Sequence, residues 1–202
     1  MSKWFPRLYD TLMSPLEKKV SFKNKRKHLI ERASGKVLEI GAGTGINFSS
    51  YTHDTSLVVA TDPNPEMVKK AQEKAKIALV PLEIQIARAE ELPFPDHSFD
   101  TVVATLVFCT IPHPESALKD IYRVLKPGGK LLLFEHVQMK QSLLKASQQL
   151  LTPIWKPLCD GCHLNRDTLG LIEASPLFHV KHVDSIYSGL FLAIEAEKHS
   201  QT

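Results

Sequence analysis

The stretch VLEIGAGTGINF, residues 37–48, carries three glycines at alternate positions directly after a run of apolar residues. The run is typical of a buried strand, and a glycine-rich turn after it lets the backbone come close to a nucleotide-like ligand. No lysine follows Gly45 as a P-loop requires, and Ile46 stands where the third glycine of the dinucleotide fingerprint would fall. The turn therefore predicts a nucleotide-type ligand but disfavours both a P-loop enzyme and a nicotinamide oxidoreductase.

Asp62 is the second candidate for ligand binding. It ends the next apolar segment, SLVVATD, and follows Gly41 by 21 residues. An acidic residue at this place can accept hydrogen bonds from both hydroxyl groups of a ribose. The alternative is a turn or cap role before Pro63. Because the glycine turn lies upstream, we favour ribose binding.

Four segments follow one another at matching spacing over residues 36–135: VLEIGAGTG, DPNPEM, AEELPFPDHSFD and LKPGGKLLLFE. This combination resembles the class I S-adenosylmethionine-dependent methyltransferases of the ubiquinone-biosynthesis-like group. The resemblance implies S-adenosylmethionine as cofactor, methyl transfer as activity and a small-molecule acceptor. It agrees with the missing lysine, since this cofactor carries no phosphate.

The resemblance also assigns cofactor-binding positions. The glycines would pass close to the methionine part of the cofactor, Glu39 would organise that end, and Asp62 would take the ribose hydroxyls. The full expected set is Tyr9, Glu39, Gly41, Gly43, Asn47, Asp62, Pro63, Met67, Ala89, Glu90, Thr105 and Leu106. One position departs from the family pattern: Arg88 replaces an aspartate that often binds the adenine amino group, and arginine cannot accept a hydrogen bond. The adenine contact is then expected from the backbone or from Glu90.

Three downstream segments bear on the methyl acceptor. TLVFCTIPHPESAL, FEHV and WKPLCDGCHLNRDTLGLIE resemble the group of methyltransferase-like proteins that includes alkyl thiol S-methyltransferases. The resemblance then covers about residues 36–175 and favours a lipophilic thiol, with a phospholipid amine or a quinone-type ring as the alternative. A thiol has a pKa of about 8.5 and is partly ionised near neutrality, so a strong general base is optional.

Two residues are the expected catalytic groups. His136 ends the fifth expected strand, next to the expected methyl position, and could act as a base or orient the acceptor. Asp160 could orient a histidine or bind the acceptor; His163 and Arg166 are weaker candidates. Purely structural roles remain as alternatives, a packed strand-end histidine and an Asp-Gly turn. If both residues prove dispensable, a non-catalytic S-adenosylmethionine-binding module is the competing hypothesis.

The three cysteines, Cys109, Cys159 and Cys162, suit a reducing compartment, and we expect a cytoplasmic protein. The Cys159–Cys162 pair, even with His163, lacks the second ligand pair of a usual zinc site, so no metal is predicted. The pair also does not open a helix after a first strand, as a thioredoxin-like motif does. Cys109 lies in an apolar run and is expected to be a small buried hydrophobic residue.

Residues 1–32 hold nine basic and three acidic residues, although the net charge of the whole chain is only +3. This excess could contact an anionic membrane peripherally, or it could simply be a solvated helix face. The thiol S-methyltransferase group carries a hydrophobic N-terminal anchor, whereas this chain has WFPRLY at positions 4–9. No nucleic-acid partner is expected, because residues 105–108 are TLVF instead of the Asp/Asn-Pro-Pro-Tyr/Phe motif of nucleic-acid amino methyltransferases. The oligomeric state is open.

The elements that must position these residues alternate along the chain. Strands are expected at 36–40, 56–62, 82–87, 100–107 and 130–137, with two closing strands around Gly189. Helices are expected at 46–52, after an Asn64 cap, at 115–125 before Pro127-Gly128-Gly129, at 141–155 and at 164–174. Continuous apolar strands separated by helices indicate a parallel sheet covered on both faces. We predict an α/β fold: a Rossmann-like, doubly wound, mostly parallel seven-stranded sheet with an antiparallel edge strand. Residues 1–34 would form an N-terminal helical lid and residues 35–202 the methyltransferase domain.

Overall fold

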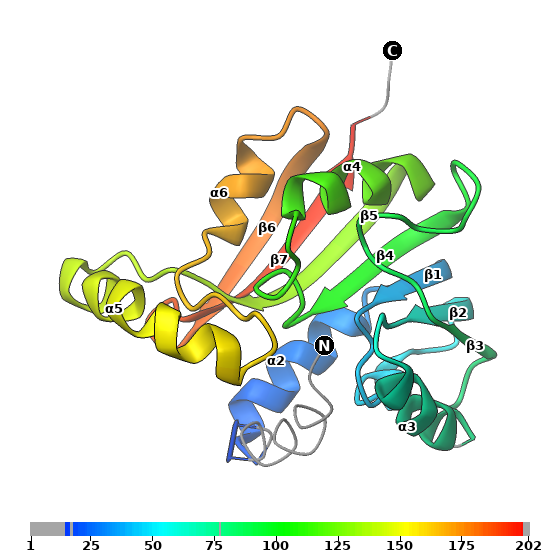
Figure 1. Ribbon diagram of the computed structural model, residues 1–202. Helices are drawn as coiled ribbons and strands as arrows, with labels where there is room; N and C mark the ends of the chain where they lie inside the picture. The colour runs from blue at the N-terminus through cyan, green and yellow to red at the C-terminus, as the bar shows by residue number, and fades with distance from the viewer. Residues whose placement is uncertain (1–14, 17, 77, 200–202) are drawn as a thin grey trace.

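The computed structural model describes residues 15–16, 18–76 and 78–199, and within these a single sheet has the strand order β3-β2-β1-β4-β5-β7-β6 (Figure 1). The strands are β1 (Gly35–Ile40), β2 (Thr55–Thr61), β3 (Leu82–Gln85), β4 (Phe99–Thr105), β5 (Leu125–His136), β6 (Phe178–Ile186) and β7 (Phe191–Lys198). The first five strands pair in parallel, and β7 runs antiparallel to both β5 and β6. The predicted Rossmann-like fold, mostly parallel with an antiparallel strand at one edge region, is confirmed.

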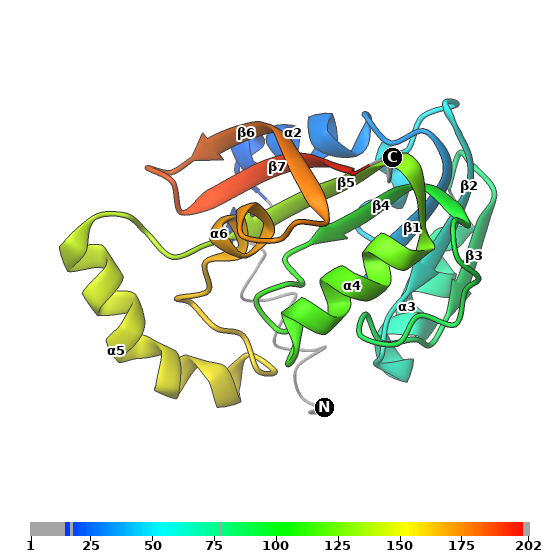
Figure 2. The ribbon, with the colours of Figure 1, turned by 90° about the horizontal axis from the view of Figure 1, so that it is seen from above.

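Helices cover both faces of the sheet. They are α2 (Val20–Ile30), the 3₁₀ helix η1 (Phe48–Ser50), α3 (Pro65–Ala75), α4 (Pro114–Val124), α5 (Ser142–Leu158) and α6 (Thr168–Glu173). One core cluster joins α2, η1 and α3 to the sheet, and a second joins α4 and α6 to it. Figure 2 shows α2 and α4 on opposite faces of the sheet, whereas α5 lies at the margin of the molecule. The structure is therefore a three-layer α/β sandwich.

The register of the central strands brings the site residues to the same edge of the sheet. Ile40 of β1 lies opposite Thr61 of β2 and Ala104 of β4, so these three strands end at the same level. β5 continues beyond β4, with Phe134 opposite Thr105 and His136 two residues further. Each strand has a buried apolar run, because helices cover both faces. The polar residues that follow these runs therefore meet at one edge of the sheet.

Several elements differ from the sequence prediction. The helix expected at 46–52 is only the 3₁₀ helix η1, and the helix expected at 164–174 is the shorter α6, which begins at Thr168. Strand β5 begins before Pro127-Gly128-Gly129, because the pairing with β4 shifts from Leu125–Phe99 to Lys130–Thr101 and a bulge absorbs the intervening residues. Helix α5 runs past Pro153 to Leu158, three residues beyond the prediction. By contrast, the predicted Asn64 cap is confirmed, since its side chain accepts a hydrogen bond from the Glu66 N–H.

Helix α2 belongs to the body of the domain. Phe22 is fully buried, and its ring lies 5.0 Å from the rings of both Phe134 and Phe191. Leu16, before α2, lines the cavity described below. Tyr9 and the rest of the segment 1–14 lie outside the described residues, so the lid stays a prediction. None of the helices in the described part of the chain is long and apolar enough to span a membrane.

Candidate active site

The turn after β1 is built around Gly43 and Asp62. Gly43 has a φ of 55°, and a Cβ added there would meet only the Gly41 carbonyl oxygen, at 4.0 Å, so the turn leaves open space beside it. The Gly43 N–H donates to Asp62 Oδ2 at 3.0 Å, and the Asn64 N–H donates to Asp62 Oδ1 at 2.8 Å. Burial raises the pKa of Asp62 above its usual range, against the lowering effect of these two hydrogen bonds. The carboxylate is thus held rigidly at the end of β2.

A cavity of about 370 Å³ opens at the carboxyl ends of the central strands. Its wall includes nine of the predicted cofactor-binding residues and both predicted catalytic residues: Gly41, Gly43, Asp62, Pro63, Met67, Ala89, Glu90, Thr105 and Leu106, with His136 and Asp160. The structure therefore brings together residues that are up to about 120 positions apart in the chain. Tyr9 lies outside the described residues and is not placed.

Glu39 and Asn47 lie behind this wall rather than in it. Asn47 Nδ2 donates to Glu39 Oε1 at 2.8 Å and to Thr105 Oγ1 at 2.9 Å, and the Tyr51 hydroxyl donates to Glu39 Oε2 at 2.7 Å. Burial raises the pKa of Glu39 to about 7, although both hydrogen bonds oppose the rise. In this structure Glu39 therefore acts through Asn47, which fixes the end of β4.

The part of the cavity that was predicted to hold adenine has several apolar lining residues. Pro63, Met67 and Ala89 line it, and the Arg88 guanidinium lies 3.3 Å from Glu90 Oε1. The arginine that departs from the family pattern is thus paired with the acid next to the predicted adenine site. Apolar side chains flanked by backbone polar groups suit a purine ring.

The end of β4 turns sharply into the cavity. Leu106 has a φ of 57°, which is uncommon for a residue with a Cβ, and its N–H donates to the Phe134 carbonyl at 2.7 Å. The next two N–H groups, of Val107 and Phe108, both donate to Glu135 Oε1, at 2.8 and 3.0 Å. Burial raises the pKa of Glu135 to about 7. This buried carboxyl group clamps the loop that carries Thr105 to Cys109 along the wall.

His136 meets two cysteines that the sequence analysis treated separately. His136 Nε2 lies 3.1 Å from Cys162 Sγ, and these atoms and Cys109 Sγ all lie within 4.8 Å of one another. The hydrogen bond from Cys109 and, after it, the contact with His136 hold the pKa of the Cys162 thiol below its usual range. Cys109 is buried as predicted, yet it lines the cavity. The signal was in the sequence: each of the three downstream segments contributes one of these residues.

The two cysteines of the Cys-x-x-Cys segment do not act as a pair, because only Cys162 belongs to the cluster. Cys159 lies outside this cluster of ligand atoms, and His163 Nδ1 faces the Cys109 carbonyl and Arg166. Asp160, with a φ of 48°, lines the cavity, and its negative charge contributes to the raised pKa of Asp62. Asp160 therefore lies close enough to Asp62 for its charge to act on that carboxyl group.

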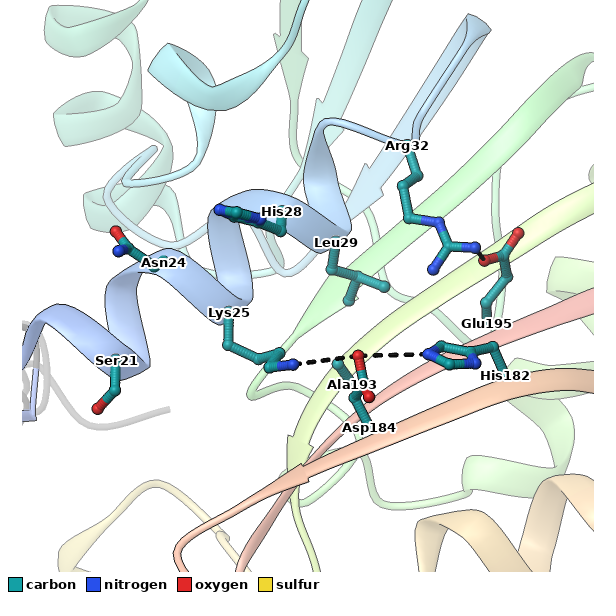
Figure 3. Close-up of a pocket in the computed structure, with 10 residues that line it drawn as sticks. All are labelled: Ser21, Asn24, Lys25, His28, Leu29, Arg32, His182, Asp184, Ala193 and Glu195. Atoms are coloured by element: carbon teal, nitrogen blue, oxygen red, sulfur yellow. Dashed lines mark hydrogen bonds and ion pairs between the residues drawn. The ribbon is translucent and has the colours of Figure 1, made fainter.

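A second cavity, of about 320 Å³, lies between α2 and the β6–β7 hairpin (Figure 3). Lys25 and His182 both point at Asp184, and the hydrogen bond from Lys25 holds the pKa of that carboxyl below its usual range. Arg32 contacts Glu195 in the same cavity. These charges are paired on the surface, and the described lining of this cavity contains none of the sequence-predicted residues. The first cavity is therefore the candidate active site.

The sequence of this chain is similar to known methyltransferases. Residues 38–133 match the family described as methyltransferase domain. Over 193 residues the chain is 37% identical to thiol S-methyltransferase TMT1B of Rattus norvegicus, which covers 88% of this chain and 77% of the rat protein. The chain belongs to the class I S-adenosylmethionine-dependent methyltransferases.

Two further matches show how wide this methyltransferase family is. Phosphatidylethanolamine N-methyltransferase of Cereibacter sphaeroides is 35% identical over 124 residues, 60% of this chain and 61% of that protein. A solved S-adenosylmethionine-dependent methyltransferase of Methanosarcina mazei shares the fold, with a TM-score of 0.65, 24% identity and coverage of 86% of this chain and 97% of that one. These matches establish the enzyme class and the cofactor. They do not fix the methyl acceptor, because relatives named for different acceptors share the domain.

The residues of the first cavity fit S-adenosylmethionine. A Cβ at Gly43 would stand in open space, and Asp62 presents a fixed carboxylate of the kind that can accept hydrogen bonds from ribose hydroxyls. Among the described residues that line the cavity there is no lysine, as suits a ligand without phosphate. The two acids Asp62 and Asp160 add negative potential for a cofactor that carries a sulfonium charge.

Proposed function

We propose that this methyltransferase acts on the sulfur of a small lipophilic thiol. The observation that carries the proposal is the acceptor end of the cavity, where His136 and two cysteine sulfurs lie among apolar side chains. The apolar residues at this end are Val107, Ile111, Pro112, Trp155, Leu164, Leu190 and Phe191. Such a surface favours an alkyl or aryl group by roughly 25 cal/mol for each Å² that it removes from water. The similarity to a rat protein named thiol S-methyltransferase supports the same acceptor.

The chain's own residues contribute binding and alignment. When bound, S-adenosylmethionine supplies a methyl group that its sulfonium already makes electrophilic. Asp62 and the Gly43 turn hold the cofactor, and the loop clamped by Glu135 forms the wall between cofactor and acceptor. His136 orients the acceptor sulfur, while Asp160 is a positioning residue close to Asp62. Alignment and exclusion of water are the main demands of this reaction, because a thiol is already a good nucleophile.

The test compares initial rates of methyl transfer to hexanethiol, hexanol and hexylamine, which differ only in the acceptor atom. We expect turnover of the thiol alone, and kcat/KM that rises about fourfold for each methylene from butanethiol to hexanethiol. His136→Asn should abolish most of this activity, whereas the same change at His179, on strand β6, should leave it unchanged. No methylation of any thiol would overturn the proposal.

Phosphatidylethanolamine N-methylation is the second candidate, because a relative with that name shares 35% identity over 124 residues. It predicts the opposite preference, with methylation of an amine headgroup and none of hexanethiol. A phospholipid amine must lose a proton before it can attack, and the acceptor end offers His136 as the nearest titratable nitrogen. The matched acceptor series separates the two candidates directly.

A further inference from the structure

Cys109, His136 and Cys162 form a compact set of soft ligand atoms. They come from the loop after β4, the end of β5 and the segment after α5, and their ligand atoms all lie within 4.8 Å of one another. All three residues line the cavity. Thiolate sulfur and imidazole nitrogen are the ligands that Zn²⁺ prefers, with bond lengths near 2.3 and 2.0 Å. A single ion can therefore contact all three once the side chains shift to tetrahedral spacing.

We propose that these three residues bind one zinc ion with an open fourth position, and that this position takes the acceptor thiol. Structural zinc sites are closed by four protein ligands, whereas catalytic sites keep three and leave one position to water or substrate. Cys159 is the nearest sequence candidate for a fourth ligand, yet it lies outside the set. The open position faces the cavity that also holds Thr105 and Leu106. The role of the acceptor rests on the proposed function; zinc binding itself does not.

The chemistry balances without an added base. As the acceptor sulfur forms a bond to zinc, the S–H bond breaks and the proton leaves to solvent, while the ion stays Zn²⁺. The bound thiolate keeps a lone pair for attack on the methyl carbon of S-adenosylmethionine. The new S–C bond would form as the bond from this methyl group to the sulfonium breaks, and S-adenosylhomocysteine would leave as a neutral thioether.

Hydrogen bonds join the two segments that carry the cysteines of the cluster. The His163 N–H donates to the Cys109 carbonyl at 2.8 Å, which joins the loops that carry the two cysteines. Arg166 donates to the carbonyls of Phe108 and Ile111, at 2.8 and 2.6 Å, on both sides of Cys109. Ligands fixed in this way bind metal more tightly, since little order is lost on binding.

The test measures metal content of the purified full-length chain and its reconstitution with zinc and with cobalt. We expect one equivalent of zinc, and a cobalt form with a thiolate-to-metal charge-transfer band in the near ultraviolet and the strong visible bands of tetrahedral coordination. Cys109→Ser, Cys162→Ser and His136→Ala should each lose the band. Cys159→Ser is the matched control and should keep it. Calorimetric binding of S-adenosylmethionine to each variant reports whether the domain is still folded.

Several outcomes would overturn the zinc site. A chain that binds S-adenosylmethionine but takes up neither metal, or one in which Cys159→Ser behaves like the other variants, contradicts it. A Cys109–Cys162 disulfide in the freshly purified protein, seen by mass spectrometry, would point to redox chemistry instead. If hexanethiol leaves the cobalt spectrum unchanged, or is methylated equally fast by metal-free protein, the open position fails while the proposed function stands.

A separate observation concerns helix α5, whose amphipathic pattern is inverted. Its polar residues Gln148 and Thr152 are buried, and Gln148 bonds the backbone of Met139 and Val137. Six large apolar residues of the helix are exposed instead: Leu143, Leu144, Leu150, Leu151, Ile154 and Leu158. Leu143 and Leu150 expose 82% and 77% of their surface. Their spacing places them on one face of a helix that lies at the margin of the molecule (Figures 1 and 2).

We infer that this α5 face docks on an anionic phospholipid surface. Residues 138–158 contain Lys140, Lys145 and Lys156 and no acidic residue, which complements negative headgroups. The same helix carries Trp155 in the wall of the cavity, so docking would bring the acceptor end to the membrane. A lipophilic acceptor could then enter from the bilayer without crossing water.

Co-sedimentation with phosphatidylcholine vesicles, with and without phosphatidylserine, tests this surface. We expect binding to the anionic vesicles that weakens with salt and falls at least tenfold in Leu150→Ser/Ile154→Ser. Leu79→Ser, which changes an equally exposed leucine elsewhere, should bind like the parent. No binding by the parent would overturn the inference. Full binding by the double variant, together with loss of binding on deletion of residues 1–14, would also overturn it and would favour the basic N-terminal segment.

Discussion

Glu39 shows how one buried residue can link the end of β1 to the end of β4. Its carboxyl group is buried and accepts hydrogen bonds from Asn47 and Tyr51, and Asn47 also donates to Thr105. Burial, the largest influence on this group, raises its pKa to about 7. The charged form is therefore disfavoured in the folded state relative to the unfolded chain.

This raised pKa makes the stability of the protein depend on pH in a defined direction. Between the unfolded pKa of about 4.5 and the folded pKa of about 7, the folded state binds more protons, so the contribution of Glu39 falls as pH rises. We expect the stability of the parent relative to Glu39→Gln to decrease by roughly 2–3 kcal/mol from pH 5 to pH 8. Urea unfolding of both proteins at the two pH values measures it. A constant difference would show that Glu39 does not titrate in this range.

Asp62 allows the most direct residue-scale test of the cofactor site. Its two oxygens are oriented by the N–H groups of Gly43 and Asn64, and the side chain lines the cavity. We expect Asp62→Asn to weaken S-adenosylmethionine binding about tenfold or more, since one or two hydrogen bonds to ribose are lost. Isothermal titration calorimetry measures it, with Asp54→Asn, an exposed change, as control. Equal affinity of all three proteins would place the ribose elsewhere.

At the scale of elements, two glycines in the turn after β1 have different surroundings. A Cβ at Gly41 would approach Val107 Cγ2 to 2.4 Å, whereas a Cβ at Gly43 meets no side chain within 4 Å. Both glycines have positive φ, so either alanine costs about 1 kcal/mol or more in backbone strain. Only the first also forces the cavity wall to move.

We therefore expect different defects from the two alanine substitutions. Gly43→Ala should lose S-adenosylmethionine affinity strongly but unfold within about 1–2 kcal/mol of the parent. Gly41→Ala should lose several kcal/mol, because the clash adds to the strain. Denaturation and calorimetry on the same preparations separate stability from binding. If Gly43→Ala binds the cofactor as well as the parent, the cofactor does not pass over this turn.

The elements also show what could be read from the sequence. The β1 and β4 strands were predictable because their apolar runs are continuous and bounded by breakers, and Asn64 because a cap needs only local geometry. The Pro127-Gly128-Gly129 bulge was missed because it depends on the register against β4. The meeting of Cys109, His136 and Cys162 could not be derived from spacing, since three separate loops bring them together.

At the scale of the whole molecule, Arg166 joins distant segments around the acceptor end. Its guanidinium donates to the carbonyls of Phe108 and Ile111 and faces His163. These contacts tie the segment after α5 to the loop after β4, across more than 50 residues of chain. The acceptor wall therefore depends on one cation that does not itself line the cavity.

We expect Arg166→Gln to raise the KM for the thiol severalfold and to reduce stability by about 1–3 kcal/mol, because buried carbonyls lose their donors. The affinity for S-adenosylmethionine should change little, since Asp62 and the glycine turn lie at the other end of the cavity. Steady-state kinetics and calorimetry together measure both quantities. A loss of cofactor affinity with an unchanged thiol KM would contradict this division of the cavity.

The identity of the acceptor atom is the central claim, and one competition experiment tests it most directly. The enzyme is given S-adenosylmethionine with a deuterated methyl group, together with hexanethiol and vesicles that contain phosphatidylethanolamine, and mass spectrometry locates the label. We predict that the label appears on the sulfur of hexanethiol and that the phospholipid stays unmethylated. Label on the phospholipid amine, with none on the thiol, would contradict the account.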